Sequence, residues 1–287
     1  MNPKKIFELA QGSTCGRDHR VSGKNNHDAV SCLINDEAII AIVCDGCSSG
    51  KHSEVGAKLG AQLIATTLCQ YIYKIGESIN LLTPEQPFPY WERVRQDVLA
   101  QLRVLANAMG SSLSQTVNEY FLFTVVGLLV LPNYTSVFSI GDGVFVINGE
   151  VNTIGPFPNN APPYLAYGLT GSSLAEEQAQ LLDFQIHRAF PNQEIDSIMI
   201  GTDGVCDLAN VTAKEMPGKP DLVGPLSQFW EKDLFFRNPD ALRRRLSLIN
   251  RDVTRLNPVG LALKKELGLL PDDTTMAVIR RCQTERS

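Results

Sequence analysis

The sequence predicts a layered α+β fold in which antiparallel strands pair beneath helices. First, strands and helices occur in runs (strands, two helices, more strands, one helix, a last strand), without the regular alternation of a parallel α/β protein. Second, the two long helical segments are amphipathic, so each can cover one face of a sheet. A helix layer on each side of paired sheets would use all of these elements.

The first half of the chain supplies a hairpin and two covering helices. Residues 29–35 and 37–45 are rich in β-branched side chains and meet at a short polar turn, which predicts two antiparallel strands. Residues 53–74 and 90–112 repeat apolar side chains at a spacing near 3.6, which predicts two helices.

The second half returns to strands. We expect them at residues 121–131, 136–140, 144–148, 183–190, 195–201 and 274–279. A third helix with a basic face, Arg243 to Arg245, is expected over residues 240–255, and this arginine run is interpreted as a solvated helix face. Residues 155–173 and 210–224 lack periodicity and are expected to form loops. Since neither a repeat nor a break in composition divides the chain, we expect a single domain over residues 1–287.

Composition excludes several classes of protein. The chain has 287 residues, of which 44% are hydrophobic and 20% charged, so disorder, collagen and coiled coils are excluded. With a net charge of −5 the chain lacks the overall positive charge that is typical of nucleic-acid-binding proteins, so we expect no nucleic-acid partner. No apolar stretch approaches a membrane span, and the N-terminus does not resemble a secretory signal. Seven scattered cysteines, an odd number, are typical of a reducing compartment, and we expect a cytoplasmic protein.

Four aspartates lie at the ends of predicted strands. Asp45, Asp142 and Asp203 are each followed by glycine, and Asp272 precedes the last strand. A single Asp-Gly pair is usually only a turn. Four carboxylates gathered at one end of a sheet, however, would repel one another unless a cation lay among them. Hard oxygen ligands of this kind favour magnesium or manganese over zinc.

Five motifs contain these aspartates and carry a family resemblance. In order they are Asn26-His27-Asp28-Ala29, Ala41-Ile42-Val43-Cys44-Asp45-Gly46, Ser139-Ile140-Gly141-Asp142-Gly143, Ile200-Gly201-Thr202-Asp203-Gly204-Val205 and Asp272-Asp273-Thr274-Thr275-Met276. No single motif is specific, but the ordered set is. From about residue 12 to residue 280 the sequence resembles metal-dependent protein phosphatases of the 2C type, and it is most similar to a bacterial branch of that family.

The resemblance implies a four-layer αββα sandwich with a metal centre at one end. It implies hydrolysis of phosphoserine or phosphothreonine by a water molecule that two metals, Mn²⁺ or Mg²⁺, activate. By motif position, Asp45 would bridge both metals, the Gly46 carbonyl would bind one, and Asp203 and Asp272 would hold the other. Asp28 would support the site through metal-bound water, and Asp142 would share a weaker third metal with Asp203. The implied partner is a phosphorylated protein, a kinase or its target.

The sequence departs from the family pattern at two positions. Many members carry a histidine, proposed as general acid, where this chain has Cys47, and a phosphate-binding arginine where it has Gly23. His19, Arg17 and Arg20 lie nearby and are candidates to bind phosphate. These departures leave open a catalytically impaired regulatory or phosphopeptide-binding module. Another alternative is a different metallohydrolase that uses a similar carboxylate cluster to act on small phosphate esters.

Two further patterns resemble functional motifs but do not meet the requirements of those motifs. Residues 46–53 resemble a nucleotide-binding P-loop, but the glycine spacing is too short and His52 follows Lys51, so we expect them to lead into a helix cap at Ser53. Cys44 and Cys47 form a C-x-x-C pair without the second pair of ligands that zinc requires. We interpret them as one buried and one loop cysteine. Oxidation of Cys47, next to the predicted metal ligands, remains a hypothesis for inhibition.

Overall fold

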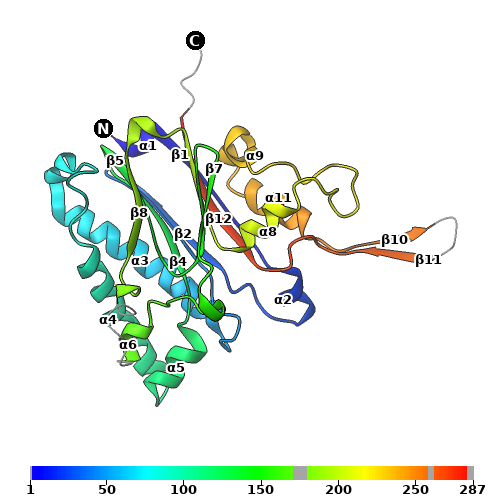
Figure 1. The fold of residues 1–287 in the computed structure, drawn as a ribbon, viewed down its shortest axis with the longest axis horizontal. Coiled ribbons are helices and arrows are strands. Elements are labelled where there is room, and N and C mark those ends of the chain that lie inside the picture. Colours follow the sequence, from blue (N-terminus) through cyan, green and yellow to red (C-terminus); the bar gives the residue numbers. More distant parts are fainter. Residues whose placement is uncertain (1, 171–179, 258–261, 283–287) are drawn as a thin grey trace, which may run out of the picture.

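A computed structural model describes residues 2–170, 180–257 and 262–282. Two five-stranded antiparallel sheets are stacked between two layers of helices (Figure 1), which confirms the predicted α+β sandwich. Among the helices within the described ranges, none has both the length and the apolarity needed to cross a bilayer.

The first sheet contains the predicted hairpin. Its order is β2-β3-β4-β5-β8, and the strands are β2 (Ala29–Ile34), β3 (Ile39–Cys44), β4 (Val125–Val130), β5 (Tyr134–Ile140) and β8 (Gln185–Pro191). β2 and β3 pair in register from Ala29 opposite Cys44 to Ile34 opposite Ile39, which places Asp45 directly after the paired region.

The second sheet brings the two ends of the chain together. Its order is β1-β12-β9-β6-β7, and the strands are β1 (Phe7–Thr14), β12 (Thr274–Arg281), β9 (Ser197–Gly201), β6 (Gly143–Ile147) and β7 (Glu150–Ile154). The short helix α1 (Pro3–Ile6) leads into β1, which pairs with β12 along its whole length. The chain passes from one sheet to the other between β5 and β6.

Alternation along the strands builds three apolar layers. On β3, Ile39, Ala41 and Val43 face the second sheet, whereas Ile40, Ile42 and Cys44 face the helices. The helices on that side are α3 (Ser53–Ile75), α4 (Trp91–Met109) and α5 (Leu113–Tyr120). Both long helices therefore occupy the segments expected from their apolar spacing.

A second group of helices covers the other sheet. It comprises α8 (Gly204–Asn210), α9 (Gln228–Glu231), α10 (Leu234–Arg237) and α11 (Ala241–Ile249). Leu242 and Leu246 of α11 are fully buried in the same cluster as Met276 and Val278 of β12. Short 3₁₀ turns occur at Gly76–Leu81, Pro158–Asn160 and Asn192–Glu194.

The structure corrects the expected helix over residues 240–255. α11 ends at Ile249, because the buried Asn250 side chain bonds to the Cys15 carbonyl and the Leu270 amide instead of continuing the helix. The chain then forms a separate hairpin of β10 (Val253–Asn257) and β11 (Ala262–Glu266).

Two further expectations need adjustment. The segment over residues 155–173 contains a short helix, α6 (Tyr167–Thr170), and its last three residues lie outside the described ranges. Helix α3 has His52, not Ser53, at its N-cap position. The Ser53 hydroxyl caps nothing and donates to the Cys47 carbonyl at 2.8 Å.

Candidate active site

The four strand-end aspartates converge on one cleft. Asp45 follows β3 in the first sheet, whereas Asp203 and Asp272 flank β9 and β12 in the second. Asp142 lies where the chain crosses between the sheets. All four line a cleft of about 230 Å³ at this end of the sandwich. The structure therefore brings together side chains that are up to 227 residues apart in sequence (272 − 45).

Glycines allow the crossing turn that carries Asp142. Gly141 and Gly143 have positive φ angles of 88° and 145°, which L side chains rarely adopt. A Cβ atom on Gly143 would also lie 2.8 Å from the Gly201 carbonyl oxygen. The turn thus needs glycine both for its conformation and for the close approach of β9.

Backbone contacts fix the peptide after Asp45. The Gly46 amide donates to the His27 carbonyl at 3.2 Å, and the Thr124 amide donates to the Asp45 carbonyl at 2.8 Å. A Cβ atom on Gly46 would lie 2.8 Å from the Ser53 carbonyl oxygen. No side chain fits there without displacing backbone.

Asp28 lies behind the cleft and joins the two sheets. It is 3% exposed, and its Oδ2 accepts a 2.7 Å hydrogen bond from Thr202, which follows β9. Its Oδ1 is buried without a hydrogen-bond partner among the described residues. A buried carboxylate oxygen is costly unless a donor or a cation meets it. This orphaned atom therefore fits a site that holds a cation and its bound water.

Burial and mutual repulsion raise the pKa values of the cluster. Burial raises the pKa of Asp45 well above its usual range, and Asp28, Asp203 and the other cleft carboxylates raise it further. Burial, followed by Asp272 and Asp142, raises the pKa of Asp203 to about 6. Burial is also the main cause of the raised pKa values of Asp142, Asp272 and Asp28. Divalent cations would relieve this repulsion, so the donor set fits hard metal ions.

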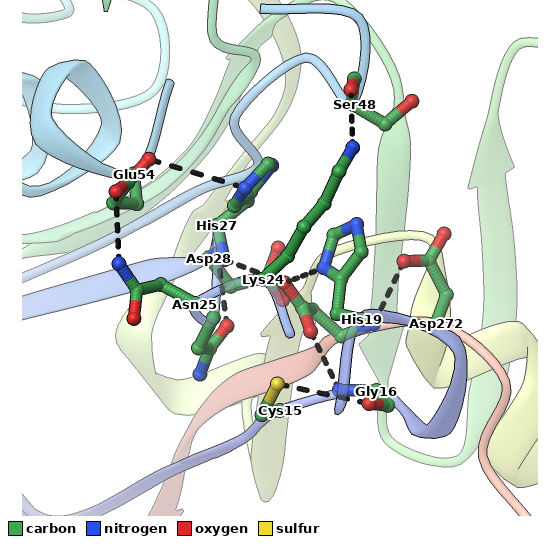
Figure 2. A network of polar contacts seen from close by, with 12 residues as sticks. Cys15, Gly16, His19, Lys24, Asn25, His27, Asp28, Ser48, Glu54 and Asp272 are labelled. Carbon is green, nitrogen blue, oxygen red and sulfur yellow. Dashed lines mark hydrogen bonds and ion pairs between the residues drawn. The ribbon is translucent and has the colours of Figure 1, made fainter. Parts of the chain in front are cut away.

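A buried carboxylate holds His19 at the cleft (Figure 2). Asp273 is 2% exposed and accepts hydrogen bonds from the Gly16 and His27 amides, each at 2.5 Å, and from His19 Nδ1 at 2.8 Å. Ligand atoms of His19, Asp272 and Asp273 lie within 4.8 Å of one another. Because three donors already occupy Asp273, we regard it as the residue that orients His19, which lines the cleft.

The two candidate arginines point elsewhere. His19, Arg17 and Arg20 all lie on the short helix α2 (Arg17–Val21), but Arg17 bonds to the Gly268 carbonyl and Arg20 pairs with Asp252 at 3.4 Å. Neither arginine lines the cleft, whereas His19 does.

Lys24 does not line the cleft either, but it contacts a residue that does (Figure 2). Its Nζ donates to the carbonyl of Ser48, a cleft residue, at 3.0 Å, so its ammonium group lies at the rim of the cleft.

Cys47 forms part of the cleft wall, next to Ser48. Its Sγ lies 3.0 Å from Ser49 Oγ, and Tyr164 also lines the cleft. Burial raises the pKa of the Cys47 thiol, but hydrogen bonds from Ser49, from Tyr164 and from backbone amides outweigh burial, so the net shift is downward. Cys44 is fully buried, as expected for the other member of the pair.

Three site residues were not predicted from the sequence. Asp273 directly follows the predicted ligand Asp272, and Lys24 directly follows Gly23, so each was near a predicted position. Tyr164 lies in the segment expected to be a loop. The doubled aspartate was a usable signal, but nothing local indicates that Tyr164 lines the cleft or that Lys24 lies at its rim.

Comparison with known families agrees with this geometry. The protein phosphatase 2C family matches residues 15–239, which is most of the chain and includes Asp28, Asp45, Asp142 and Asp203. The chain belongs to the protein phosphatase 2C family.

Solved structures support the fold of this protein phosphatase 2C chain. A bacterial serine phosphatase is 14% identical, with a TM-score of 0.54, and the match covers 98% of this chain and 100% of that one. The serine/threonine phosphatase Stp1 from Staphylococcus aureus is also 14% identical, with a TM-score of 0.50 and coverages of 97% and 96%. No curated protein matches the sequence. At 14% identity the likeness to these two solved structures concerns the fold alone.

Proposed function

We propose that the chain is a metal-dependent protein phosphatase that hydrolyses phosphoserine and phosphothreonine. Family membership supports a phosphatase. The observation that carries the proposal is the convergence of Asp45, Asp142, Asp203 and Asp272 on one cleft. Phosphoryl transfer requires mainly positioning and positive charge, and a cluster of carboxylates supplies that charge by holding cations.

The proposed metal ligands are the residues found at the cleft. Asp45 and the Gly46 carbonyl would hold one ion, with Asp45 shared by a second ion that Asp203 and Asp272 bind. Asp142 would contribute to a weaker third site, and Asp28 would act through bound water. When bound, Mn²⁺ or Mg²⁺ supplies charge neutralisation for phosphate and Lewis acidity toward water.

His19 and Lys24 would contact the substrate phosphate. Because Asp273 engages His19 Nδ1, contact with a phosphate oxygen falls to Nε2. Lys24 would add a mobile cation at the rim of the cleft. The pair would replace the arginine expected at Gly23, in place of Arg17 and Arg20, whose guanidinium groups are engaged outside the cleft.

The test measures phosphate release from a phosphothreonine peptide with Mn²⁺. We expect activity that EDTA abolishes and that Asp203→Asn lowers by at least about 100-fold, as expected when a group that acts in the transition state is lost. Asp36→Asn is the matched control. Asp36 is exposed in the turn between β2 and β3, at the opposite end of these strands from Asp45.

Other outcomes favour the alternatives. Calorimetry that shows bound Mn²⁺ in a protein without hydrolysis would support an impaired, phosphopeptide-binding homologue, with Cys47 as the first suspect. Turnover of small phosphate esters without turnover of the phosphopeptide would support a different metallohydrolase. For the phosphatase we propose a cytoplasmic phosphoprotein, a kinase or its target, as substrate.

A further inference from the structure

The β10–β11 hairpin projects from the body of the protein (Figure 1). It forms a two-stranded sheet of its own, separate from the two large sheets. Its described contacts with the rest of the chain are at its base, where the Gly218 amide donates to Glu266 at 2.7 Å and Arg251 bonds to the Pro217 carbonyl. An isolated two-stranded hairpin is only marginally stable in water, so a surface that covers it would stabilise it.

The register places two leucines side by side on one face of the hairpin. Leu256 lies opposite Leu263, so both side chains project from the same face. They are 59% and 74% exposed. Thr254 and Lys265 are the neighbouring cross-strand pair on this face. Two adjacent leucines at the end of a projecting arm offer an anchor for an apolar side chain of a partner.

The other face is cationic. Arg255 lies directly opposite Lys264, and like charges in this position destabilise a hairpin. Glu266 is the acidic residue of this face, and its Oε1 lies 3.3 Å from Lys264 while its Oε2 already accepts from the Gly218 amide. Glu266 therefore offsets the charge of Lys264, and an acidic partner would relieve the remaining repulsion between Arg255 and Lys264.

The base of the hairpin is continuous with the wall of the cleft. Arg20 of α2 pairs with Asp252 at 3.4 Å, and Lys265 of β11 pairs with the same carboxylate at 3.4 Å. Arg17 of α2 bonds to the Gly268 carbonyl at 3.2 Å. Helix α2 also carries His19, which lines the cleft. A chain that leaves the cleft past His19 would meet α2 and then the hairpin.

We propose that the β10–β11 hairpin is a docking arm for the phosphoprotein substrate, and that it binds an acidic segment bearing a leucine-sized side chain next to the phosphorylated residue. This inference rests on the proposed phosphatase function. The leucine pair anchors the apolar side chain on one face, and Arg255 and Lys264 on the opposite face complement acidic residues that pass around the edge of the two-stranded ribbon. Docking would act on substrate binding and leave the chemistry at the cleft unchanged.

The test compares one phosphothreonine peptide with and without an acidic, leucine-containing tail on either side. The tail should lower KM about tenfold, equivalent to roughly 1.4 kcal/mol. Leu256→Ser/Leu263→Ser and Arg255→Glu/Lys264→Glu should each remove this gain while kcat and turnover of p-nitrophenyl phosphate stay unchanged. High salt should weaken the contribution of the charged face. The control is Val151→Ser, which alters a similarly exposed residue (53%) on β7.

Each of the other possible results would refute either the docking arm or the proposed phosphatase function. A tail that leaves KM unchanged in the wild-type protein, or a gain that survives in both hairpin variants, overturns the docking arm. A dimer that dissociates in the leucine variant, measured by light scattering, overturns it in favour of self-association. If no peptide is hydrolysed, the phosphatase proposal fails separately. Fluorescence anisotropy with the tailed peptide then still measures whether the hairpin binds it.

Discussion

Cys47 is the residue at which the sequence is expected to depart from the family pattern. It follows Asp45 and Gly46 directly and lies half-buried in the cleft wall. Hydrogen bonds from Ser49 and Tyr164 favour its thiolate, because they outweigh the effect of burial and lower the pKa. Thiolates are the form that reacts with peroxide. The lowered pKa and the place of Cys47 in the cleft wall make it the candidate for oxidation.

We expect hydrogen peroxide to inactivate the enzyme through Cys47. Peroxide would oxidise the Cys47 thiolate to a sulfenic acid and be reduced to water, and a thiol reductant would restore activity. Cys47→Ser should retain activity under peroxide. Cys15→Ser is the control, because burial raises the pKa of Cys15 to about 11 and keeps it protonated. Residual activity after timed peroxide exposure is the measurement, and equal loss in Cys47→Ser and wild-type protein would refute the prediction.

Asp273 was missed, but the carboxylates that line the cleft were predictable, because each lies next to a strand that the local sequence pattern predicts. The placement of the basic groups was not predictable. Arg17, His19 and Arg20 occupy one short helix, and which of them faces the cleft depends on two distant contacts, with Asp273 and with Asp252. Sequence position alone therefore could not separate His19 from its neighbours, nor could it identify Lys24.

At the scale of elements, close backbone contacts join α3 to the segment that leads into β4. A Cβ atom on Gly56 would lie 2.0 Å from the Tyr120 carbonyl oxygen, and one on Gly60 would lie 2.2 Å from the Phe123 ring. Gly56 is buried on the inner face of α3. The helix can lie this close to the chain only because these positions have no side chain, and this packing places Asp45 and the Ser53 end of α3 together.

Gly56→Ala should therefore destabilise the protein although alanine is the better helix former. Helix propensity favours alanine by about 1 kcal/mol. Displacement of the Tyr120 backbone should cost more, so we expect a net loss of about 1–3 kcal/mol in the free energy of unfolding. Urea denaturation measures this loss. Lys58→Ala, an exposed change on the same helix, should stay within about 0.5 kcal/mol. A stabilised Gly56→Ala protein would show that the contact relaxes freely.

Elements that depend on local pattern were predicted, and elements that depend on distant partners were not. α3 and the β2–β3 hairpin follow from spacing and turn residues. β1 was missed because its pairing partner is β12, at the other end of the chain. The expected helix over residues 240–255 ran into the first three residues of β10 because no glycine or proline interrupts the segment, whereas Asn250 ends the helix through contacts with Cys15 and Leu270.

At the scale of the whole molecule, the cleft is a seam between the two sheets. Asp45 belongs to the first sheet, and Asp203 and Asp272 belong to the second. The buried Thr202–Asp28 hydrogen bond crosses the same seam. Ionised carboxylates on the two sheets would repel one another at this end, and a cation held by both sheets would join them. Metal binding should therefore stabilise the entire fold as well as enable chemistry.

Mn²⁺ should raise the melting temperature, and more strongly at pH 7.5 than at pH 5. The pKa of Asp203 is about 6 in the folded protein against 3.8 in an ordinary aspartate. The metal-free folded state therefore holds more protons than the unfolded state in this window, and its stability falls as pH rises through it. At pH 7.5 Mn²⁺ meets ionised carboxylates, whereas at pH 5 it must displace protons.

Mn²⁺ at about 100 times its Kd should add about 2.7 kcal/mol to the free energy of unfolding, which corresponds to a rise in melting temperature of roughly 5–10 °C. Differential scanning fluorimetry with Mn²⁺ or EDTA measures the shift. Asp203→Asn should reduce it and Asp36→Asn should not, while an equal shift at both pH values would show that these carboxylates do not bind the ion.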